Sequence, residues 1–587
     1  NNADAQVVTE GGQAYWTLSD ADVTGTKYER NGVEMLLEAE TRGYQFITVE
    51  DALRYAKNGD TVKLLANAEL DETYVNEKSL TLDLNGKTLS TALEDGSTTR
   101  HLYAIHNYGE LTITDSSDTK TGKISARGNY NYGKLTLEAG TIDACDGNGG
   151  YAVNNVSGSE FIMNGGAVTA SYEDGDAPGN GYDATPVRVE SGAKATINGG
   201  EINNSANFTF AIDNAGEVTV NGGTVTSVHS TVSNYGTMTI NGGSFTCNGL
   251  EGVTAHALVV WDGSTTTING GTFDGKDNYN GFNVDASEGA NVVIKGGNFL
   301  PVHSGSLYGE GTITVSGGTF FDEIDDQRCE LGFQAVANTE GTYDVKRTDK
   351  REAYTIEDDG QMTEFVNEKE IEVGTLTYKR SLASDLYNAL YVPFEIPVAN
   401  FSDKYEFYYF NDVHSDVNGV PSSFEIVKIT EGTLKANHPY LVKPINADDK
   451  DMDLEITGAQ LRSTTNKRYE VDCSSAYTLF TVRGTYSVLN GADYPGCYGM
   501  SVDGDLALIG DGKLGAFRIY LQITDREKEQ PVILPNVNKI RLRVIGEGSG
   551  DTTDIKYYDV ENQNVELIFD LQGRRVLEPK KGGLYII

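Results

Sequence analysis

Apolar and polar residues alternate in short runs through the first half of the chain, and the runs end at pairs of glycines. Residues 196–200 (Thr-Ile-Asn-Gly-Gly) and 219–223 (Thr-Val-Asn-Gly-Gly) are two clear copies. The second glycines stand at positions 166, 200, 223, 243, 271, 297 and 318. Alternation with a period of two predicts β-strands, and self-similarity at spacings of this size is typical of a solenoid.

Each repeat has room for three short strands. Residues 211–214, 217–220 and 224–226 alternate in this way within one repeat. Stacking such coils with parallel pairing gives a parallel β-helix, which we expect to be right-handed because parallel crossovers nearly always are. A helix over residues 48–58, begun by Thr48 with Asp51 three residues later, is predicted to plug the N-terminal end of the solenoid.

A second register marks another corner of each coil. The triplets Asn-Tyr-Gly at 107–109, 131–133 and 234–236, and Asn-Ala-Gly at 214–216, each precede an apolar–Thr–apolar strand. Asn and Gly tolerate left-handed backbone, so these triplets predict tight corners. Asparagines that stack at such corners are expected to form a ladder of side-chain amides.

The spacing of the apolar runs changes after the repeats. We predict an irregular N-terminal cap segment over 1–47, the β-helix with its helical plug over 48–347 and a linker over 348–375. An antiparallel β-sandwich is expected over 376–548, from turn-separated apolar runs such as 391–396, 405–410 and 424–429. A small C-terminal β-module is expected over 549–587. The whole chain is thus predicted to be all-β.

Composition limits the partners. The net charge of −40 makes phosphate contacts repulsive and argues against nucleic acid. No apolar run reaches membrane-spanning length. The five cysteines show no metal-ligand spacing, and Cys473 and Cys497 are the one local pair suited to a disulfide. We expect a monomer without a cofactor or a specific metal site, with Ca²⁺ as the cation that clustered carboxylates could take.

Several segments resemble surface proteins of gut-dwelling Gram-negative bacteria that carry pectin-lyase-like β-helix domains and are classed as adhesins. Asn-Gly-Asp-Thr-Val-Lys-Leu-Leu at 58–65 and Leu-Asp-Leu-Asn-Gly-Lys-Thr-Leu at 82–89 resemble the opening of those domains. Asn-His-Pro-Tyr-Leu-Val-Lys-Pro at 437–444 is similar to their C-terminal sandwich, and Asp-Leu-Gln-Gly-Arg-Arg-Val at 570–576 to a module tied to secretion or attachment. The resemblance implies an extracytoplasmic protein, secreted or on the cell surface.

Aromatic residues at the corners are the candidates for ligand binding. Tyr108, Tyr132 and Tyr235 occupy equivalent corners, and Trp261 replaces the corner pattern in a later repeat. Aromatic rings at these places could stack on sugar rings, or they could cover the edge of the coil. An exposed Trp261 would favour a glycan-binding surface, and a buried one would not.

The β-helix scaffold also carries polysaccharide lyases and glycoside hydrolases, which gives an alternative. A lyase needs Ca²⁺-binding acids and a Lys or Arg base, and Arg188 and Lys295 are the candidates on coil strands. No pattern gathers acids beside either residue, so no catalytic residue is assigned. We therefore expect a non-catalytic binding or adhesion protein whose ligand is a glycan or a surface protein, with an enzyme or a purely structural stalk as the alternatives.

Overall fold

The computed structural model describes residues 5–10, 13–18, 27–30, 33–92, 102–144, 150–170, 184–205, 209–249, 254–276, 280–360, 362–415, 420–465, 469–473, 478–525, 530–534, 537–549 and 557–559. The chain divides into two compact units, Asn1–Lys346 and Arg347–Ile587. Strands dominate both, as the sequence predicts for an all-β protein.

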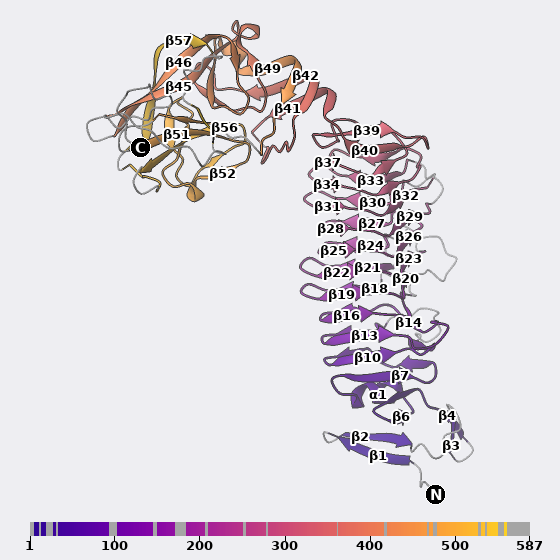
Figure 1. The fold of residues 1–587 in the computed structure, drawn as a ribbon. Helices are drawn as coiled ribbons and strands as arrows, with labels where there is room; N and C mark the ends of the chain where they lie inside the picture. Colours follow the sequence, from indigo (N-terminus) through magenta and orange to yellow (C-terminus); the bar gives the residue numbers. More distant parts are fainter. Residues whose placement is uncertain are drawn as a thin grey trace, which may run out of the picture. The chain divides into compact units, whose positions relative to one another are not determined.

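The first unit is a parallel β-helix. Each coil gives one strand to each of three sheets, so that strands of successive coils lie one above another (Figure 1). The parallel strands of the first sheet are β7 (Asp60–Leu64), β10 (Ser79–Asp83), β13 (Glu110–Thr114), β16 (Lys134–Leu137), β19 (Glu160–Met163), β22 (Lys194–Ile197), β25 (Glu217–Val220), β28 (Thr237–Ile240), β31 (Thr265–Ile268), β34 (Asn291–Ile294) and β37 (Thr312–Val315). The second sheet contains β8 (Ala68–Leu70), β11 (Thr88–Thr91), β14 (Lys123–Ala126), β17 (Thr141–Ala144), β20 (Ala167–Ala170), β23 (Glu201–Asn204), β26 (Thr224–Ser227), β29 (Ser244–Cys247), β32 (Thr272–Asp274), β35 (Asn298–Phe299) and β38 (Thr319–Phe320), and ends with β40 (Tyr343–Arg347) and β39 (Phe333–Ala337). The third sheet contains β9 (Tyr74–Asn76), β12 (Ile105–Asn107), β15 (Tyr130–Asn131), β18 (Tyr151–Asn155), β21 (Thr185–Val189), β24 (Ile212–Asn214), β27 (Val232–Asn234), β30 (Leu258–Val260), β33 (Phe282–Ala286) and β36 (Gly305–Tyr308).

Side-chain alternation explains this fold. In β25, Val218 and Val220 are buried, whereas Glu217 is exposed and Thr219 half-exposed, and the other first-sheet strands repeat this order. The inward residues stack into one continuous apolar core. Burial of apolar surface is the main favourable term in folding, and a stacked repeat lets every coil share it with its neighbours.

Two ladders of asparagine amides confirm the predicted stacking. Inside the coil, Asn76, Asn107, Asn131 and Asn155 are linked by Nδ2-to-Oδ1 hydrogen bonds of 2.7–2.8 Å, and Asn214 bonds to Asn234 in the same way. A second, solvent-exposed ladder joins Asn164, Asn198, Asn221, Asn241 and Asn269 at 2.8 Å. The inner ladder is buried, so its amides depend on one another, on nearby backbone and on buried hydroxyl groups such as that of Thr266 for their hydrogen bonds.

The predicted helix at the N-terminal end is present as α1 (Val49–Tyr55). Thr48 caps it, because its hydroxyl accepts a hydrogen bond from the backbone N–H of Asp51 at 3.3 Å. Val49, Ala52 and Leu53 are buried in the core of the β-helix. The amphipathic face of α1 therefore covers apolar residues at the end of the coil, which is the role expected of the plug.

The segment before α1, predicted to be irregular, contains strands. β5 (Ala39–Thr41) and β6 (Tyr44–Phe46) pair antiparallel with each other, and β5 also pairs with β7 of the first coil. β1 (Ala5–Glu10) and β2 (Gln13–Leu18) extend the same sheet, while β3 (Lys27–Arg30) and β4 (Val33–Leu36) form a hairpin. These strands lack the repeat pattern, which is why the sequence did not reveal them.

The second unit contains one large sheet and several small ones. β41 (Lys350–Asp358), β42 (Ile371–Ser381) and β49 (Asp451–Leu461) form a three-stranded sheet. The large sheet follows the order β43 (Asn388–Leu390), β48 (Tyr440–Pro444), β45 (Tyr405–Ser415), β46 (Pro421–Glu431), β57 (Lys539–Ser549), β54 (Leu506–Leu508), β53 (Tyr498–Met500), β56 (Arg518–Asp525), β51 (Thr478–Thr485), β50 (Tyr469–Asp472) and β58 (Tyr557–Asp559). Short pairs are formed by β44 (Ile396–Pro397) with β47 (Thr433–Leu434) and by β52 (Leu489–Asn490) with β55 (Lys513–Leu514), and 3-10 turns cover Val398–Asn400, Ala447–Lys450 and Gly491–Asp493.

The second unit differs from the sequence prediction in detail. Most of its strand pairs are antiparallel, but β41 with β42 and β46 with β57 are parallel. Residues 348–375, predicted as a linker, contribute β41 and the start of β42. The predicted strand at 391–396 is mostly irregular, since Pro393 lacks an N–H and the carbonyl of Val392 bonds to the N–H of Asn437 at 2.7 Å.

The remaining predictions concern the cysteines and the C-terminal module. Cys473 and Cys497 are both buried, and no disulfide joins them, so the pairing considered from their spacing is wrong. Burial raises the pKa of the Cys497 thiol to about 11. Of the predicted C-terminal module, residues 550–556 and 560–587 lie outside the described residues.

Candidate ligand-binding surface

One corner of the β-helix carries the aromatic candidates. It lies between the third and first sheets, directly after the inward-facing residue that ends each third-sheet strand. Backbone hydrogen bonds align it from coil to coil, as from the N–H of Tyr235 to the carbonyl of Asn214 at 2.7 Å. The residues that follow one another at this corner, here called the corner column, are Glu77, Tyr108, Tyr132, Val156, Glu190, Ala215, Tyr235, Trp261 and Ser287.

The aromatic residues of the corner column form two stacked pairs. The rings of Tyr108 and Tyr132 lie 4.4 Å apart with an interplanar angle of 2°. Those of Tyr235 and Trp261 lie 5.3 Å apart at 6°. Tyr132 and Tyr235 are separated by four coil steps, or about 19 Å at the usual strand spacing. The structure therefore brings the four predicted residues together as two separate pairs on one edge.

The two pairs differ in exposure. Tyr108 and Tyr235 are 53% and 54% exposed, whereas Tyr132 and Trp261 are half-buried. The indole N–H of Trp261 donates to the hydroxyl of Ser233 at 3.0 Å. The indole is thus fixed in place from below, and Tyr235 is the more accessible ring of its pair.

Further aromatic residues on the third sheet extend the first pair. Tyr130 contacts the rings of Tyr103 at 4.7 Å, His106 at 5.3 Å and Tyr132 at 6.0 Å. The guanidinium of Arg127 lies 5.2 Å from the centre of the Tyr103 ring. These residues were not predicted as ligand-binding candidates, although His106 and Tyr130 stand at equivalent positions two residues before the corner tyrosines.

Burial disfavours the charged forms of Tyr103 and His106 in this cluster. It raises the pKa of the Tyr103 phenol to about 12, with a further increase from the hydrogen bond to Tyr130. It lowers the pKa of the His106 imidazole. The cluster therefore offers neutral rings and hydroxyl groups, which suit an uncharged polar ligand.

Arg188, the first candidate base, is committed to an ion pair. It is the last residue but one of β21, and its Nη1 contacts the carboxylate of Asp213 on the next coil. Its guanidinium is also 5.8 Å from the centre of the Tyr151 ring. Burial raises the pKa of Asp213, an effect that the charge of Arg188 opposes. An arginine held in this way does not act as a free proton acceptor.

Lys295, the second candidate, lies elsewhere. It is exposed and follows Asn269 at the end of the outer asparagine ladder, at the corner between the first and second sheets. Lys295 lies four coil steps from Arg188, which is on a strand of the third sheet and not at this corner. In the part of the chain that the structure describes, no three His, Cys, Asp or Glu side chains are grouped as metal ligands. The structure does not assemble the two lyase candidates into one site.

A buried histidine on the third sheet has a structural explanation. The Nδ1 of His256 accepts a hydrogen bond from the N–H of Phe282 at 3.2 Å, so its Nε2 carries the proton and faces Asp285 at 3.5 Å. Burial lowers the pKa of His256. The imidazole links neighbouring coils.

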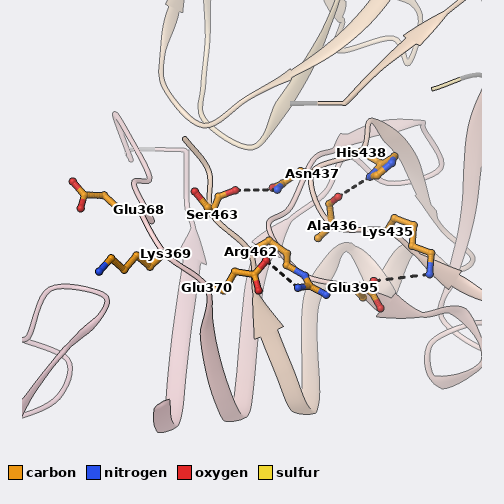
Figure 2. A pocket seen from close by; sticks show the side chains of 10 residues that line it. All are labelled: Glu368, Lys369, Glu370, Glu395, Lys435, Ala436, Asn437, His438, Arg462 and Ser463. Carbon is orange, nitrogen blue, oxygen red and sulfur yellow. Dashed lines mark hydrogen bonds and ion pairs between the residues drawn. The ribbon is translucent and has the colours of Figure 1, made fainter. Parts of the chain in front are cut away.

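The second unit has a cavity of about 730 Å³ (Figure 2). Four of the charged side chains that line it form two ion pairs, Glu370 with Arg462 at 3.0 Å and Glu395 with Lys435 at 3.9 Å. One wall is a turn in which Asn437 has a positive φ of 61° and its Nδ2 donates to the carbonyl of Ser463 at 3.0 Å. Part of the cavity lining is therefore already engaged in ion pairs and backbone hydrogen bonds.

His438, in this wall of the cavity, is expected to make the second unit less stable in acid. It is 7% exposed, its Nδ1 lies 2.6 Å from the carbonyl of Ala436, and burial lowers its pKa to about 4. The ordinary pKa of a histidine is about 6.5. Between this pH and about pH 4, the His438 side chain binds a proton in the unfolded chain but not in the folded chain. Stability should therefore fall as the pH drops from about 6.5 to about 4, by about 1.4 kcal/mol per unit.

The test is urea denaturation, followed by tyrosine circular dichroism, of the wild type and His438→Gln across this pH window. We expect a steeper pH dependence for the wild type than for the variant. Parallel curves would show that His438 does not titrate between the two states.

Comparisons with known proteins leave the family open. No protein-family model, no curated protein and no solved structure matches this chain significantly. Within the described residues, no helix is long and apolar enough to cross a membrane. The parallel β-helix rests on the observed strand pairing, and the resemblance to pectin-lyase-like surface proteins stays a prediction from sequence motifs.

Proposed function

We propose that this protein is a non-catalytic binding protein of the cell surface or the extracellular space, and that its β-helix binds glycans through the corner column. The observation that carries the proposal is the pair of aromatic stacks, each with one ring more than half exposed. Exposed tyrosines give large, rigid contact surfaces with a polar end, at a small cost in conformational entropy.

The surroundings of the stacks support a carbohydrate ligand. A sugar ring has apolar C–H faces and a rim of hydroxyl groups, so it needs a flat apolar surface beside hydrogen-bonding groups. The corner tyrosines provide the flat surface, and the ion pairs Arg188–Asp213 and Lys194–Glu217 provide hydrogen-bonding groups on the two coils that precede that of Tyr235. The remaining coils act in this proposal as a stiff support that keeps the two stacks at a fixed spacing.

The arrangement of charged residues favours binding over catalysis. A lyase needs a base beside carboxylates that hold a cation, and a hydrolase needs two carboxylates across the scissile bond. Arg188 is tied to Asp213, and Lys295 lies on another corner. Among the described residues, neither candidate stands beside a group of acidic side chains that could hold a cation.

A glycan array with the purified chain tests the proposal. We expect binding to a defined set of glycans and at least a tenfold loss of affinity in the double variant Tyr108→Ala/Tyr235→Ala. Tyr494→Ala, which removes an exposed tyrosine from the second unit, is the matched control and should bind like the wild type. The same preparations are incubated with uronate polymers and followed by ultraviolet absorbance for unsaturated products. A rise in absorbance would establish a lyase and overturn the proposal, as would unchanged binding by the double variant.

A further inference from the structure

We infer that the corner column contains a subsite for one neutral sugar ring at Ala215, directly beside the Tyr235–Trp261 stack. This inference rests on the proposed function, since it names the place and the chemical class of the ligand. The subsite is bounded by Tyr235 on the next coil and Glu190 on the previous one.

The spacing of the coils gives the subsite the thickness of one ring. Tyr235 and Glu190 belong to coils two steps apart, which is about 9.6 Å along the β-helix. Aromatic rings on neighbouring coils of this column stack at 4.4 and 5.3 Å. A ring at the level of Ala215 would therefore contact Tyr235 on one face and the Glu190 corner on the other.

Tyr235 presents a free ring face to this place. Trp261 covers the opposite face, and Tyr235 is nevertheless 54% exposed. The alanine contributes only a methyl group where Tyr108, Tyr132 and Tyr235 contribute rings at the same corner position. A bound ring would continue the Tyr235–Trp261 stack by one step.

Ion pairs flank the subsite on both sides. Asp213, two residues before Ala215, pairs with Arg188 on the third sheet. Glu217, two residues after Ala215, pairs with Lys194 on the first sheet, with Nζ and Oε2 2.8 Å apart. Each pair combines hydrogen-bond donors with acceptors, and sugar hydroxyl groups can use both.

The charges select against acidic sugars. The two cations beside the subsite, Arg188 and Lys194, are already compensated by Asp213 and Glu217. The carboxylate of Glu190 accepts a hydrogen bond from Nδ2 of Asn154 on the preceding coil at 3.3 Å. The whole chain carries a net charge of −40. The negative field of the protein would repel the carboxylate of a uronate, whereas a neutral hexose carries no charge for it to repel.

Filling the gap tests the inference with a folded protein. Tyrosine already occupies this position on three other coils, so Ala215→Tyr should stack on Tyr235 and leave the melting temperature unchanged or raised. Affinity for neutral hexasaccharides of glucose, mannose, galactose or N-acetylglucosamine, measured by calorimetry, should fall at least tenfold. Ala215→Ser, which keeps the gap open, should bind like the wild type. Ala215→Leu fills the gap without a ring, so a loss of affinity there is expected even where Ala215→Tyr does not fold.

The outcomes separate this inference from the proposed function. If the wild type binds no glycan, both are wrong. If it binds and the Tyr108→Ala/Tyr235→Ala variant does not, but Ala215→Tyr and Ala215→Leu bind like the wild type, only the subsite is wrong. Tighter binding of galacturonate hexamers than of neutral ones would overturn the assigned class of sugar.

Discussion

Replacing Asp358 with alanine is expected to destabilise the second unit by about 3–5 kcal/mol. The Asp358 side chain is 2% exposed and accepts hydrogen bonds from the hydroxyl of Tyr378 at 2.8 Å and from Nη1 of Arg518 at 2.6 Å. The Nε of Arg380 lies 3.4 Å from the same carboxylate oxygen. One carboxylate thus compensates two arginines and links β41, β42 and β56.

The size of the effect follows from what the substitution leaves behind. Arg380 is 5% exposed and cannot reach water without opening the unit. Removing one partner of a buried ion pair leaves an uncompensated charge in a poorly polarisable interior, which costs far more than the pair contributes when intact. The hydroxyl of Tyr378 would also lose its acceptor.

Hydrogen exchange of the full chain, resolved by mass spectrometry, measures the effect. Peptides from β41 and β42 should lose protection in Asp358→Ala. Glu372→Ala is the control, because Glu372 pairs with Lys350 across the same two strands but at the exposed surface. Surface pairs contribute little, so this variant should exchange like the wild type. Equal protection in both variants would contradict the assigned role of Asp358.

The parallel β-helix could be predicted from the sequence because its determinants are local and repeated. Alternation such as Val218 and Val220 inward, with Glu217 and Thr219 outward, sets the strand register, since a slip by one residue would turn the apolar set toward water. The recurrent asparagines then mark the inner ladder. Thr48 and Asp51 mark the start of α1 in the same local way.

The contacts between coils could not be predicted, because they depend on which residues lie side by side on adjacent strands. Insertions of variable length between the strands obscure this pairing in the sequence. Arg188 and Asp213 are 25 residues apart, but they lie opposite each other on adjacent strands. The Asp358–Arg518 contact spans 160 residues of a unit without repeats. Local patterns carry no information on contacts of this kind, so the ion pairs around Ala215 and the buried cluster at Asp358 emerge only from the structure.

The two asparagine ladders provide a comparison within one fold. Asn131 is 1% exposed, and its Nδ2 donates to Oδ1 of Asn155 at 2.7 Å and to the carbonyl of Glu160 at 2.8 Å. Its Oδ1 accepts from Nδ2 of Asn107 at 2.8 Å. Asn221 makes the same amide-to-amide bonds in the outer ladder, but it is exposed.

Asn131→Ala should therefore destabilise the first unit by about 3 kcal/mol, because it leaves buried amide and carbonyl groups of two neighbouring coils without partners. Asn221→Ala removes equivalent bonds whose partners can turn to water, so its cost should stay below about 1 kcal/mol. Both tryptophans of the chain, Trp16 and Trp261, belong to the first unit, so urea denaturation followed by tryptophan fluorescence reports on it selectively. Equal shifts of the urea midpoint in the two variants would mean that the inner ladder is only a consequence of coil stacking. The expected difference would mean that the inner ladder helps to cause the stacking.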